Sequence, residues 1–503
     1  MGNKLTKQKV MLGAIILLQV LMMLFVGCQK QEFHIDEIYS HILSNSYDAD
    51  RISNADWMWD NWISGEDFNE FVTVQEEEKF SYATVYKNNS LDCHPPLFYW
   101  FLHTACSFVP DCFSKWFGLG INIVFFVIAS VLVYMVSNEL IKSNVGKLLP
   151  VILWGFSQFA VDVCSFIRMY MLLTVFALGF VYLHIRMIKN GVRPAGLFLI
   201  WILIYLGAMT HYYSLLLSFW GVVLFCVYLL FKKKIKTMFL YGMGSCVSVA
   251  AFLISYPYVL VQATGSSTNN VGNEIASNLF NIKLWVKMTI KTAYEGGTKI
   301  SYNWLISCII LLAIVLTFVV LLVRNIKNKT IGKASDWKEI IWLTASIIMT
   351  FLSISFIGGE YVYLRYFYHI IPMAYIVAVV VFERLLQNKH LLSKVIVSIC
   401  IAFSLLNAVY GTANGYSSYL FEESANADKT LGKYSDMPLI VTVDKLDPAI
   451  PTGNLTKFKM FSSVYMTGEK NILDNDLFKK TLDKQGECVA YIPTDTYWTP
   501  SIQ

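Results

Sequence analysis

Long apolar runs separated by short polar segments make up most of the first 410 residues of the chain. A run of about 20 apolar residues is long enough for a helix to cross the hydrocarbon core of a bilayer. We therefore predict an all-α polytopic membrane protein with about eleven spans. The predicted spans are residues 9–27, 117–138, 147–163, 168–188, 196–211, 213–231, 237–258, 302–323, 339–357, 366–384 and 391–410.

Composition agrees with this pattern. Hydrophobic residues make up 56% of the 503 positions and charged residues 15%, whereas a soluble domain contains about 45–50% apolar residues. The net charge of +5 is small for this length, so no nucleic-acid partner is expected. The first apolar run follows a basic start and could be a signal peptide, but ten further spans follow it, which favours an uncleaved span.

Lysine and arginine gather in alternate loops, which indicates that these loops face the cytoplasm. The basic loops lie at residues 142–147, 186–193, 232–236, 324–333 and 384–394. The N-terminus is then cytoplasmic, and the intervening loops and the C-terminal part are extracytoplasmic. We expect residues 1–410 to form one transmembrane domain of a cell-membrane protein.

Two external loops are predicted to carry helices that lie at the membrane surface. In the acidic loop 28–116, the apolar segment 95–110 is too short to span and would invert every later basic loop if it did. Trp100 suits an interfacial position. In the loop 259–301, three lysines four residues apart share one helical face, from which they either extend to lipid headgroups or contact a phosphate. These are Lys283, Lys287 and Lys291.

The C-terminal part, residues 411–503, is less apolar. It contains strand-like runs at 439–443 and 488–492 and a polar helical stretch at 474–484. We predict a small external α/β module. In the first loop, a disulfide among the three cysteines is one alternative, although pairing cannot be deduced from the sequence. These are Cys93, Cys106 and Cys112.

Adjacent carboxylates, Asp36 and Glu37, follow directly after the first span. A carboxylate can act as a general base toward a hydroxyl or amine, and two neighbouring carboxylates repel, which raises the pKa of one of them. Alternatively, both are ordinary acids of an acidic loop. Acids beside a membrane are costly, so we treat this pair as a candidate catalytic site.

Arg168 and Arg365 each lie at the external start of a predicted span. Arginine binds phosphate oxygens in a bidentate way, and the positive-inside bias makes external arginines less expected. Anchoring at the interface is the alternative. A tyrosine follows each arginine in the sequence: Tyr170 follows Arg168 and Tyr366 follows Arg365.

Two histidines belong to the same external side. His94 precedes Pro95-Pro96, which stiffen the start of the interfacial helix, and His211 lies in a short turn. Each could have a purely structural role. Carboxylates, arginines and histidines on one side of an apolar bundle suit transfer from a lipid-phosphate donor.

These motifs, in this order and on this side, resemble the GT-C glycosyltransferase superfamily, near the protein O-mannosyltransferases and lipid A aminoarabinose transferases. The resemblance is carried by Asp36-Glu37, His94-Pro95-Pro96-Leu97, Arg168-Met169-Tyr170, Thr210-His211-Tyr212 and Arg365-Tyr366. It covers residues 9–260 well and extends loosely to 410. It implies a GT-C-like fold, a glycosyltransferase domain at 1–410 with a catalytic loop at 28–116, and a polyprenyl-phosphate-linked sugar as donor.

The resemblance also implies roles for the residues. Asp36 would be the catalytic base, with inversion at the sugar, and Glu37 would assist it on the acceptor side. Arg168 and Arg365 would bind the donor phosphate. The remaining matched positions would bind substrate: His94, His211, Tyr170 and Tyr366. The acceptor would be an extracytoplasmic glycan, lipid or protein.

Two departures leave the branch and its acceptor open. The protein mannosyltransferases carry a lysine soon after the proline pair, where this chain has Leu97-Phe98-Tyr99, and the aminoarabinose transferases carry one before it, where this chain has His94. Some relatives bind a divalent metal near this site. His34, Asp36 and Cys93, with His94, could supply ligands, but their spacing matches no compact metal motif, and no cofactor is predicted with certainty.

Two other kinds of protein remain alternatives. A transporter or lipid flippase would place ionisable groups near mid-bilayer and would have broken helices in both halves. A non-catalytic envelope scaffold, built around the C-terminal module, would leave the external arginines without a role.

Overall fold

The computed structural model describes residues 2–50, 55–264, 281–301, 303–328, 337–358, 362–386, 390–415, 417–421, 429, 431–442, 449–467, 479 and 488–491. The chain forms two compact units. Unit 1 consists of Met1–Gln29, Cys93–Phe98 and Leu119–Ser418, and unit 2 of Lys30–Asp92, Tyr99–Gly118 and Tyr419–Gln503. Most of the loop 28–116 therefore groups with the C-terminal part. The expected domain boundary after residue 410 stays a prediction.

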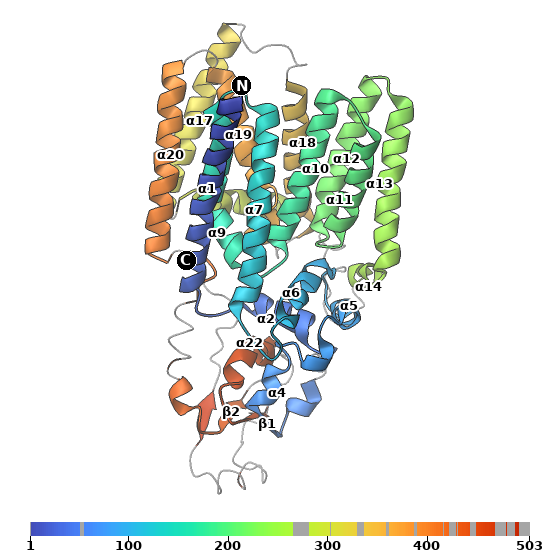
Figure 1. Cartoon of the computed structure of the whole chain (residues 1–503), viewed down its shortest axis with the longest axis vertical. Helices are drawn as coiled ribbons and strands as arrows, with labels where there is room; N and C mark the ends of the chain where they lie inside the picture. The colour runs from blue at the N-terminus through green and yellow to red at the C-terminus, as the bar shows by residue number, and fades with distance from the viewer. Residues whose placement is uncertain are drawn as a thin grey trace. The chain divides into compact units, whose positions relative to one another are not determined.

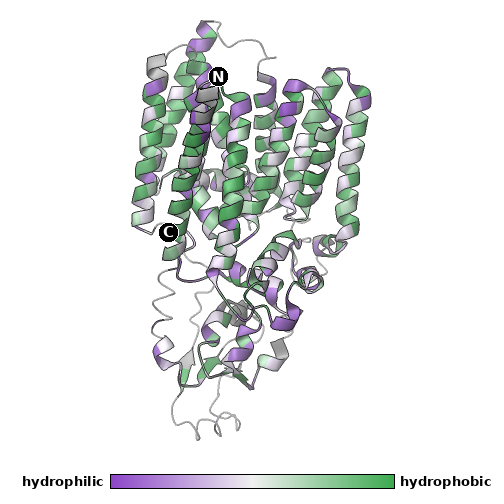
Figure 2. Ribbon diagram, in the orientation of Figure 1, coloured by the Kyte–Doolittle hydropathy of each residue, from purple (hydrophilic) through white to green (hydrophobic). Residues whose placement is uncertain are grey.

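Unit 1 is built from apolar helices that run side by side (Figures 1 and 2). In the described part of the chain, eight helices are long and apolar enough to cross a membrane, or nine if a bent pair counts as one span. The protein is a multi-pass membrane protein. The eight are α1 (Gly2–Gln29), α7 (Lys115–Leu140), α10 (Tyr170–Asn190), α12 (Tyr213–Phe231), α13 (Ile235–Ser255), α17 (Trp304–Lys327), α18 (Lys338–Ile357) and α20 (His390–Ala413).

The other predicted spans also fall on helices. The run 147–163 is the bent pair α8 (Asn144–Gly155) and α9 (Gln158–Ser165), whose axes differ by 54°. The bend follows from Ser157, whose hydroxyl accepts a hydrogen bond from the N–H of Ala160 and so starts a new helix. The two remaining runs form shorter helices, α11 (Pro194–Ala208) and α19 (Ile371–Leu386).

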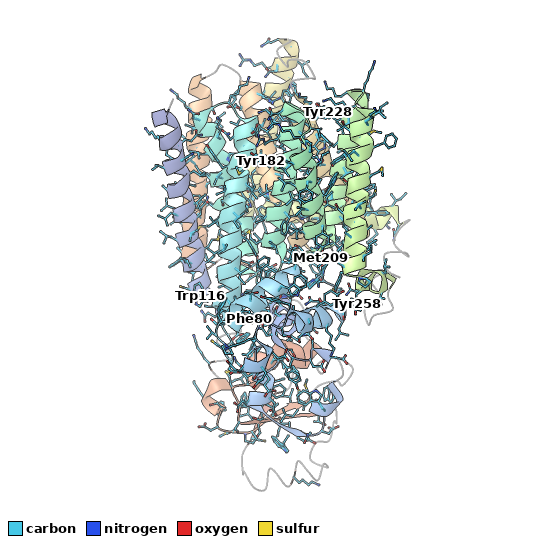
Figure 3. All side chains as sticks on the ribbon, turned by 45° about the vertical axis from the view of Figure 1, so that its right-hand side comes forward. Phe80, Trp116, Tyr182, Met209, Tyr228 and Tyr258 are labelled. Atoms are coloured by element: carbon cyan, nitrogen blue, oxygen red, sulfur yellow. The ribbon has the colours of Figure 1, made fainter. Side chains whose placement is uncertain are left out.

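Unit 1 also contains α14 (Tyr258–Thr264), α16 (Ile282–Thr298) and the 3-10 turn η5 (Leu364–Phe367). The predicted amphipathic helix in the loop 259–301 is confirmed as α16, with all three of its lysines exposed. The loops at the two ends of unit 1 alternate along the chain. In Figure 3, Tyr228 in the last turn of α12 and Met209 just before that helix mark opposite ends.

Unit 2 combines short helices with a small sheet. Its helical elements are α2 (Ile35–Asn45), η1 (Ala55–Met58), α4 (Gly65–Asn69), η2 (Glu76–Glu78), α5 (Tyr82–Ser90), most of α6 (Leu97–Ser107), η6 (Gly432–Tyr434) and α22 (Ala449–Phe458). The helix predicted at 95–110 is confirmed as α6. Of the predicted helix at 474–484, the structure describes residue 479 alone, so this prediction lies outside the described residues.

The sheet has the strand order β1-β3-β2-β4, in which β1 is antiparallel to β3 and the other pairs are parallel. The strands are β1 (Trp62–Ser64), β2 (Leu439–Thr442), β3 (Ser463–Thr467) and β4 (Val489–Tyr491). The predicted strands at 439–443 and 488–492 are confirmed as β2 and β4. The first loop contributes β1, which the sequence did not predict.

A close backbone approach fixes the end of β1. Gly65 begins α4 directly after the strand, and a Cβ atom at this position would collide with the carbonyl oxygen of Phe461. Glycine is required here for that reason. Trp62 and Tyr465, whose ring centroids are 5.2 Å apart, pack on one face of the sheet.

Candidate functional site

Arg168 lies in the turn between α9 and α10, and the backbone of this turn is fixed by a buried amide. Asn122 of α7 donates hydrogen bonds to the carbonyl oxygens of Cys164 and Phe166, at 3.1 and 2.8 Å. The N–H of Arg168 in turn donates to the Phe166 carbonyl, at 2.7 Å. The arginine side chain is therefore held on a rigid support, and it is 4% exposed.

His94 is held against the same end of unit 1 by its backbone. The hydroxyl of Tyr256 donates to the carbonyl oxygen of His94, at 3.3 Å, and the N–H of Leu97 donates to the carbonyl oxygen of Met209, at 3.1 Å. The guanidinium Nη2 of Arg168 lies 3.4 and 3.2 Å from Nδ1 and Nε2 of the His94 ring. The predicted phosphate-binding arginine and the predicted substrate-binding histidine are thus in contact.

His211 occupies the turn between α11 and α12 and packs on the residues just described. Its ring centroid is 5.7 Å from that of His94 and 5.6 Å from that of Tyr170. Its Nδ1 accepts a hydrogen bond from the N–H of Tyr213, at 3.1 Å, so the neutral ring carries its proton on Nε2.

The electrostatic environment keeps His211 neutral. Burial lowers its pKa well below the usual 6.5, and the neighbouring ionisable groups lower it further. Those groups are His94, His369, Arg168 and Arg365. At neutral pH the ring is therefore a hydrogen-bond donor beside two permanently charged guanidinium groups.

Arg365 lies in η5, between α18 and α19, and its guanidinium is surrounded by aromatic rings. The central carbon is 4.6 Å from the ring centroid of Tyr363 and 5.7 Å from those of Phe166 and Tyr366. Aromatic faces stabilise a cation through their quadrupole. Tyr366 also lies 6.3 Å from Tyr170 and 6.4 Å from His211 between ring centroids.

Unit 1 thus gathers all the predicted phosphate- and substrate-binding residues at one end of the helix bundle. They are Arg168, Arg365, His94, His211, Tyr170 and Tyr366. Sequence reasoning missed Tyr213, whose ring is 5.1 Å from that of Tyr366, and the buried His369. Tyr213 directly follows the Thr210-His211-Tyr212 motif, which could have indicated it; no sequence pattern indicated His369.

The predicted catalytic carboxylates are in unit 2, in the first turn of α2, and they have different environments. Glu37 is fully buried, and its Oε2 accepts from the Nζ of Lys30 at 2.8 Å and from the N–H of His34 at 2.6 Å. The Asp36 side chain is 24% exposed, and its Oδ2 lies 3.6 Å from Nδ1 of His34. Glu37 is thus occupied in an ion pair and a helix cap, whereas Asp36 keeps access to solvent.

Lys30 completes the surroundings of Glu37. Its ammonium also donates to the carbonyl oxygen of Tyr419, at 2.7 Å, and faces the ring of Phe421 at 5.3 Å. Burial lowers the pKa of Lys30, and the carboxylate of Glu37 opposes that shift. The pair ties the start of α2 to the C-terminal part of unit 2.

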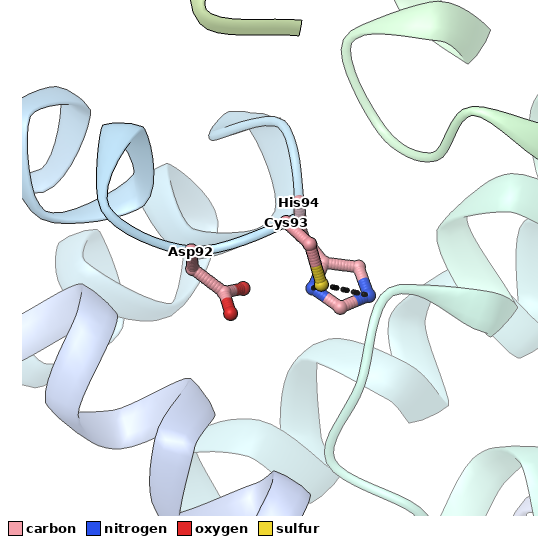
Figure 4. A group of neighbouring side chains, drawn as sticks. All are labelled: Asp92, Cys93 and His94. Carbon is pink, nitrogen blue, oxygen red and sulfur yellow. Dashed lines mark hydrogen bonds between the residues drawn. The ribbon is translucent and has the colours of Figure 1, made fainter. Parts of the chain in front are cut away.

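Metal-ligand side chains occur together at one place in the described part of the chain. Asp92, Cys93 and His94 are consecutive, and their potential ligand atoms lie within 4.8 Å of one another (Figure 4). Within this group the Sγ of Cys93 is 3.3 Å from Nδ1 of His94. A structural zinc site takes four such ligands. Every cysteine lies in the described part and is a free thiol, so the disulfide considered for the first loop is not present.

An apolar cavity of about 250 Å³ lies beside the arginine turn, between α16, α18, η5 and α19. In a 3-10 helix, residues three apart share one side. Leu364 and Phe367 accordingly both line the cavity, while Arg365 and Tyr366 between them belong to the polar cluster. Ala293 and Ala374, also in the lining, are exposed on the bundle surface.

No family model matches the chain, and no curated protein matches it significantly. Two solved structures of ArnT from Cupriavidus metallidurans are similar to it. The structure bound to undecaprenyl phosphate has 11% identity and a TM-score of 0.46, covering 96% of this chain and 90% of that one. The apo structure has 12% identity and a TM-score of 0.45, covering 97% and 90%. The functional interpretation below is therefore based on the side chains of this protein.

Proposed function

We propose that this protein is an integral membrane glycosyltransferase that moves a sugar from a polyprenyl-phosphate donor to an extracytoplasmic glycan, lipid or protein. The observation that carries the proposal is the two-sided turn η5. Its arginine and tyrosine belong to a cationic, aromatic cluster, and its leucine and phenylalanine line an apolar cavity. A substrate that joins a phosphate to a hydrocarbon chain matches both sides at once.

The cluster supplies what departure of a lipid phosphate requires. Arg168 and Arg365 would neutralise the phosphate oxygens as the bond to the sugar breaks, because preorganised charge stabilises a leaving group. Nε2–H of His211 would add a neutral hydrogen-bond donor. Tyr170 and Tyr366 offer ring faces and hydroxyls to the sugar, and His94 orients Arg168. The first isoprene units would enter the cavity.

Asp36 is the proposed general base. It would take the proton from the acceptor hydroxyl or amine as the acceptor attacks the anomeric carbon, and the sugar would be inverted. Glu37 has a positioning role in this proposal, because its contacts with Lys30 and the His34 N–H define the turn that carries Asp36. The basic loops at the other end of unit 1 favour an extracytoplasmic location for the cluster.

The test is sugar transfer in membranes that contain the full-length protein and a polyprenyl-phosphate-linked sugar. Arg168→Gln and Arg365→Gln should each lower kcat by about 10²–10³. The matched control is Arg186→Gln, which removes an arginine near the other end of α10, where it lies 4.0 Å from Glu139. If Arg168→Gln and Arg365→Gln transfer sugar with the same kcat as the control Arg186→Gln, the donor-phosphate site is refuted.

A transporter or lipid flippase is the second candidate, and one observation favours it. The bent pair α8–α9 carries a fully buried carboxylate, Asp162, which is ion-paired with Lys299. Broken helices and buried ionisable groups are typical of transporters. Lipid movement across reconstituted vesicles without any sugar transfer would select this function over the first.

A further inference from the structure

Asp162 is a buried carboxylate of unit 1 that the proposed chemistry does not use. Its side chain is fully buried, and it contacts segments far apart in the sequence. Oδ2 accepts from the hydroxyl of Ser418 at 2.8 Å and from the Nζ of Lys299 at 3.3 Å. Oδ1 accepts from the N–H of Ser418 at 3.0 Å and lies 3.4 Å from the hydroxyl of Ser417. Asp162 therefore joins α9 to the residues after α16 and after α20.

On one side, backbone hydrogen bonds connect Asp162 with Arg168. The carbonyl oxygen of Asp162 accepts from the N–H of Phe166, at 3.1 Å, and the carbonyl oxygen of Phe166 accepts from the N–H of Arg168. A shift of Asp162 would be passed along two backbone hydrogen bonds to the arginine.

On the other side, Lys299 leads toward Arg365. Lys299 directly follows α16, and Gly296 in the last turn of that helix faces Leu364, so that a Cβ atom there would be in van der Waals contact with its Cδ1, at 3.6 Å. Leu364 is the residue before Arg365 in η5. The ion pair thus connects the support of one arginine with the support of the other.

We propose that Asp162 and Lys299 are positioning residues that fix the separation of Arg168 and Arg365 and thereby set the affinity of the site for a lipid phosphate. This inference rests on the proposed function. Two charges that clamp one phosphate group must keep a fixed separation, and a misplacement of about 1 Å can cost about 10²-fold. A merely structural ion pair would change stability without changing the affinity for a phosphate in the protein that remains folded.

The experiment measures binding of undecaprenyl phosphate to the purified full-length protein in lipid nanodiscs, together with the melting temperature of each variant. Asp162→Asn and Lys299→Gln should raise the dissociation constant by about 10- to 100-fold, and Asp162→Glu should recover part of that loss. The matched control is Glu139→Gln, which breaks the ion pair with Lys189 at 2.9 Å between α7 and α10; its dissociation constant should equal that of the wild type.

A double variant keeps the test decisive if the single variants fold poorly. Asp162→Leu/Lys299→Met removes both charges, and a buried pair replaced by apolar side chains often keeps its stability. Wild-type affinity in this folded double variant would overturn the positioning role. Arg168→Gln and Arg365→Gln are measured alongside: if they also bind normally, the proposed function itself fails, whereas if they lose binding, only the positioning role fails.

Discussion

Removing the charge of Glu37 tests whether the two adjacent carboxylates have separate roles. In Glu37→Gln, the ammonium of Lys30 stays fully buried without its counter-ion. Breaking a buried ion pair from one side costs about 3–5 kcal/mol. The amide oxygen of the introduced glutamine can still accept one hydrogen bond, so we expect the lower end, about 3 kcal/mol. Each 1.4 kcal/mol of lost stability raises the equilibrium constant for local opening about tenfold.

Hydrogen exchange of the α2 amides, measured by mass spectrometry on the full-length protein, reports this local opening. Glu37→Gln should accelerate exchange across Ile35–Asn45 by about 100-fold. In the double variant Lys30→Met/Glu37→Leu no unpaired charge remains, but two hydrogen bonds are lost: the cap on the His34 N–H and the bond from Lys30 to the carbonyl oxygen of Tyr419. Together these two hydrogen bonds are worth about 1–2 kcal/mol, so about tenfold faster exchange should remain.

Two results would refute the reasoning. One is a change of less than about threefold in Glu37→Gln, which would mean that the ion pair does not hold α2 in place. The other is equally fast exchange in the single and the double variant, because the cost would then not come from an unpaired Lys30. Asp36→Asn is the matched control, since its side chain is 24% exposed; its exchange should stay at the wild-type rate.

Three further predictions address chemistry, substrate and pH. Asp36→Asn should lower transfer by at least about 10² through loss of the general base, with donor binding unchanged; normal turnover would exclude that role. Ala293→Trp should fill part of the cavity and raise KM for the lipid donor about tenfold with little change in kcat, whereas a substitution at the exposed Ala250 should not. Burial lowers the pKa of His41 to about 3, of His369 to about 4 and of His211 well below 6.5. Unfolding lets each ring take up a proton below pH 6.5. As the pH is lowered from 6.5 to 5, the free energy of unfolding should therefore fall by about 1.4 kcal/mol per pH unit for each histidine. A free energy of unfolding that stays constant over this range, measured by denaturant titration, would contradict this.

Hydropathy was sufficient to predict the long apolar helices of unit 1, because burial in a bilayer demands long apolar runs wherever a helix crosses. It could not reveal the break between α8 and α9. Both arms are apolar, and the bend depends on one serine hydroxyl, Ser157, that caps the second helix. It also could not predict β1, a strand of three residues that pairs with β3 near the other end of the chain. Pairing over such a separation leaves no local pattern.

The cluster in unit 1 could be predicted because topology alone brings its parts together. Arg168, His211 and Arg365 lie in loops on the same side of an alternating bundle. Only the family resemblance gave Asp36 and Glu37 different roles. The residue pattern alone could not, since their different environments depend on Lys30, which folds back to pair with only one of them. Adjacent residues on a helix point about 100° apart, so neighbouring acids enter different environments.

The turn η5 explains why the apolar and the polar halves of the proposed site lie together. The sequence pattern placed a span at 366–384, but α19 begins at Ile371 with Pro372 in its first turn, where proline is tolerated. The residues before it are left free to form a 3-10 turn, whose threefold repeat sends Leu364 and Phe367 to one side. In an α-helix the same two positions would lie about 60° apart around the axis, whereas the 3-10 turn aligns them. A single four-residue turn therefore presents a charged and an apolar side together, which is what the proposed binding of a lipid phosphate requires.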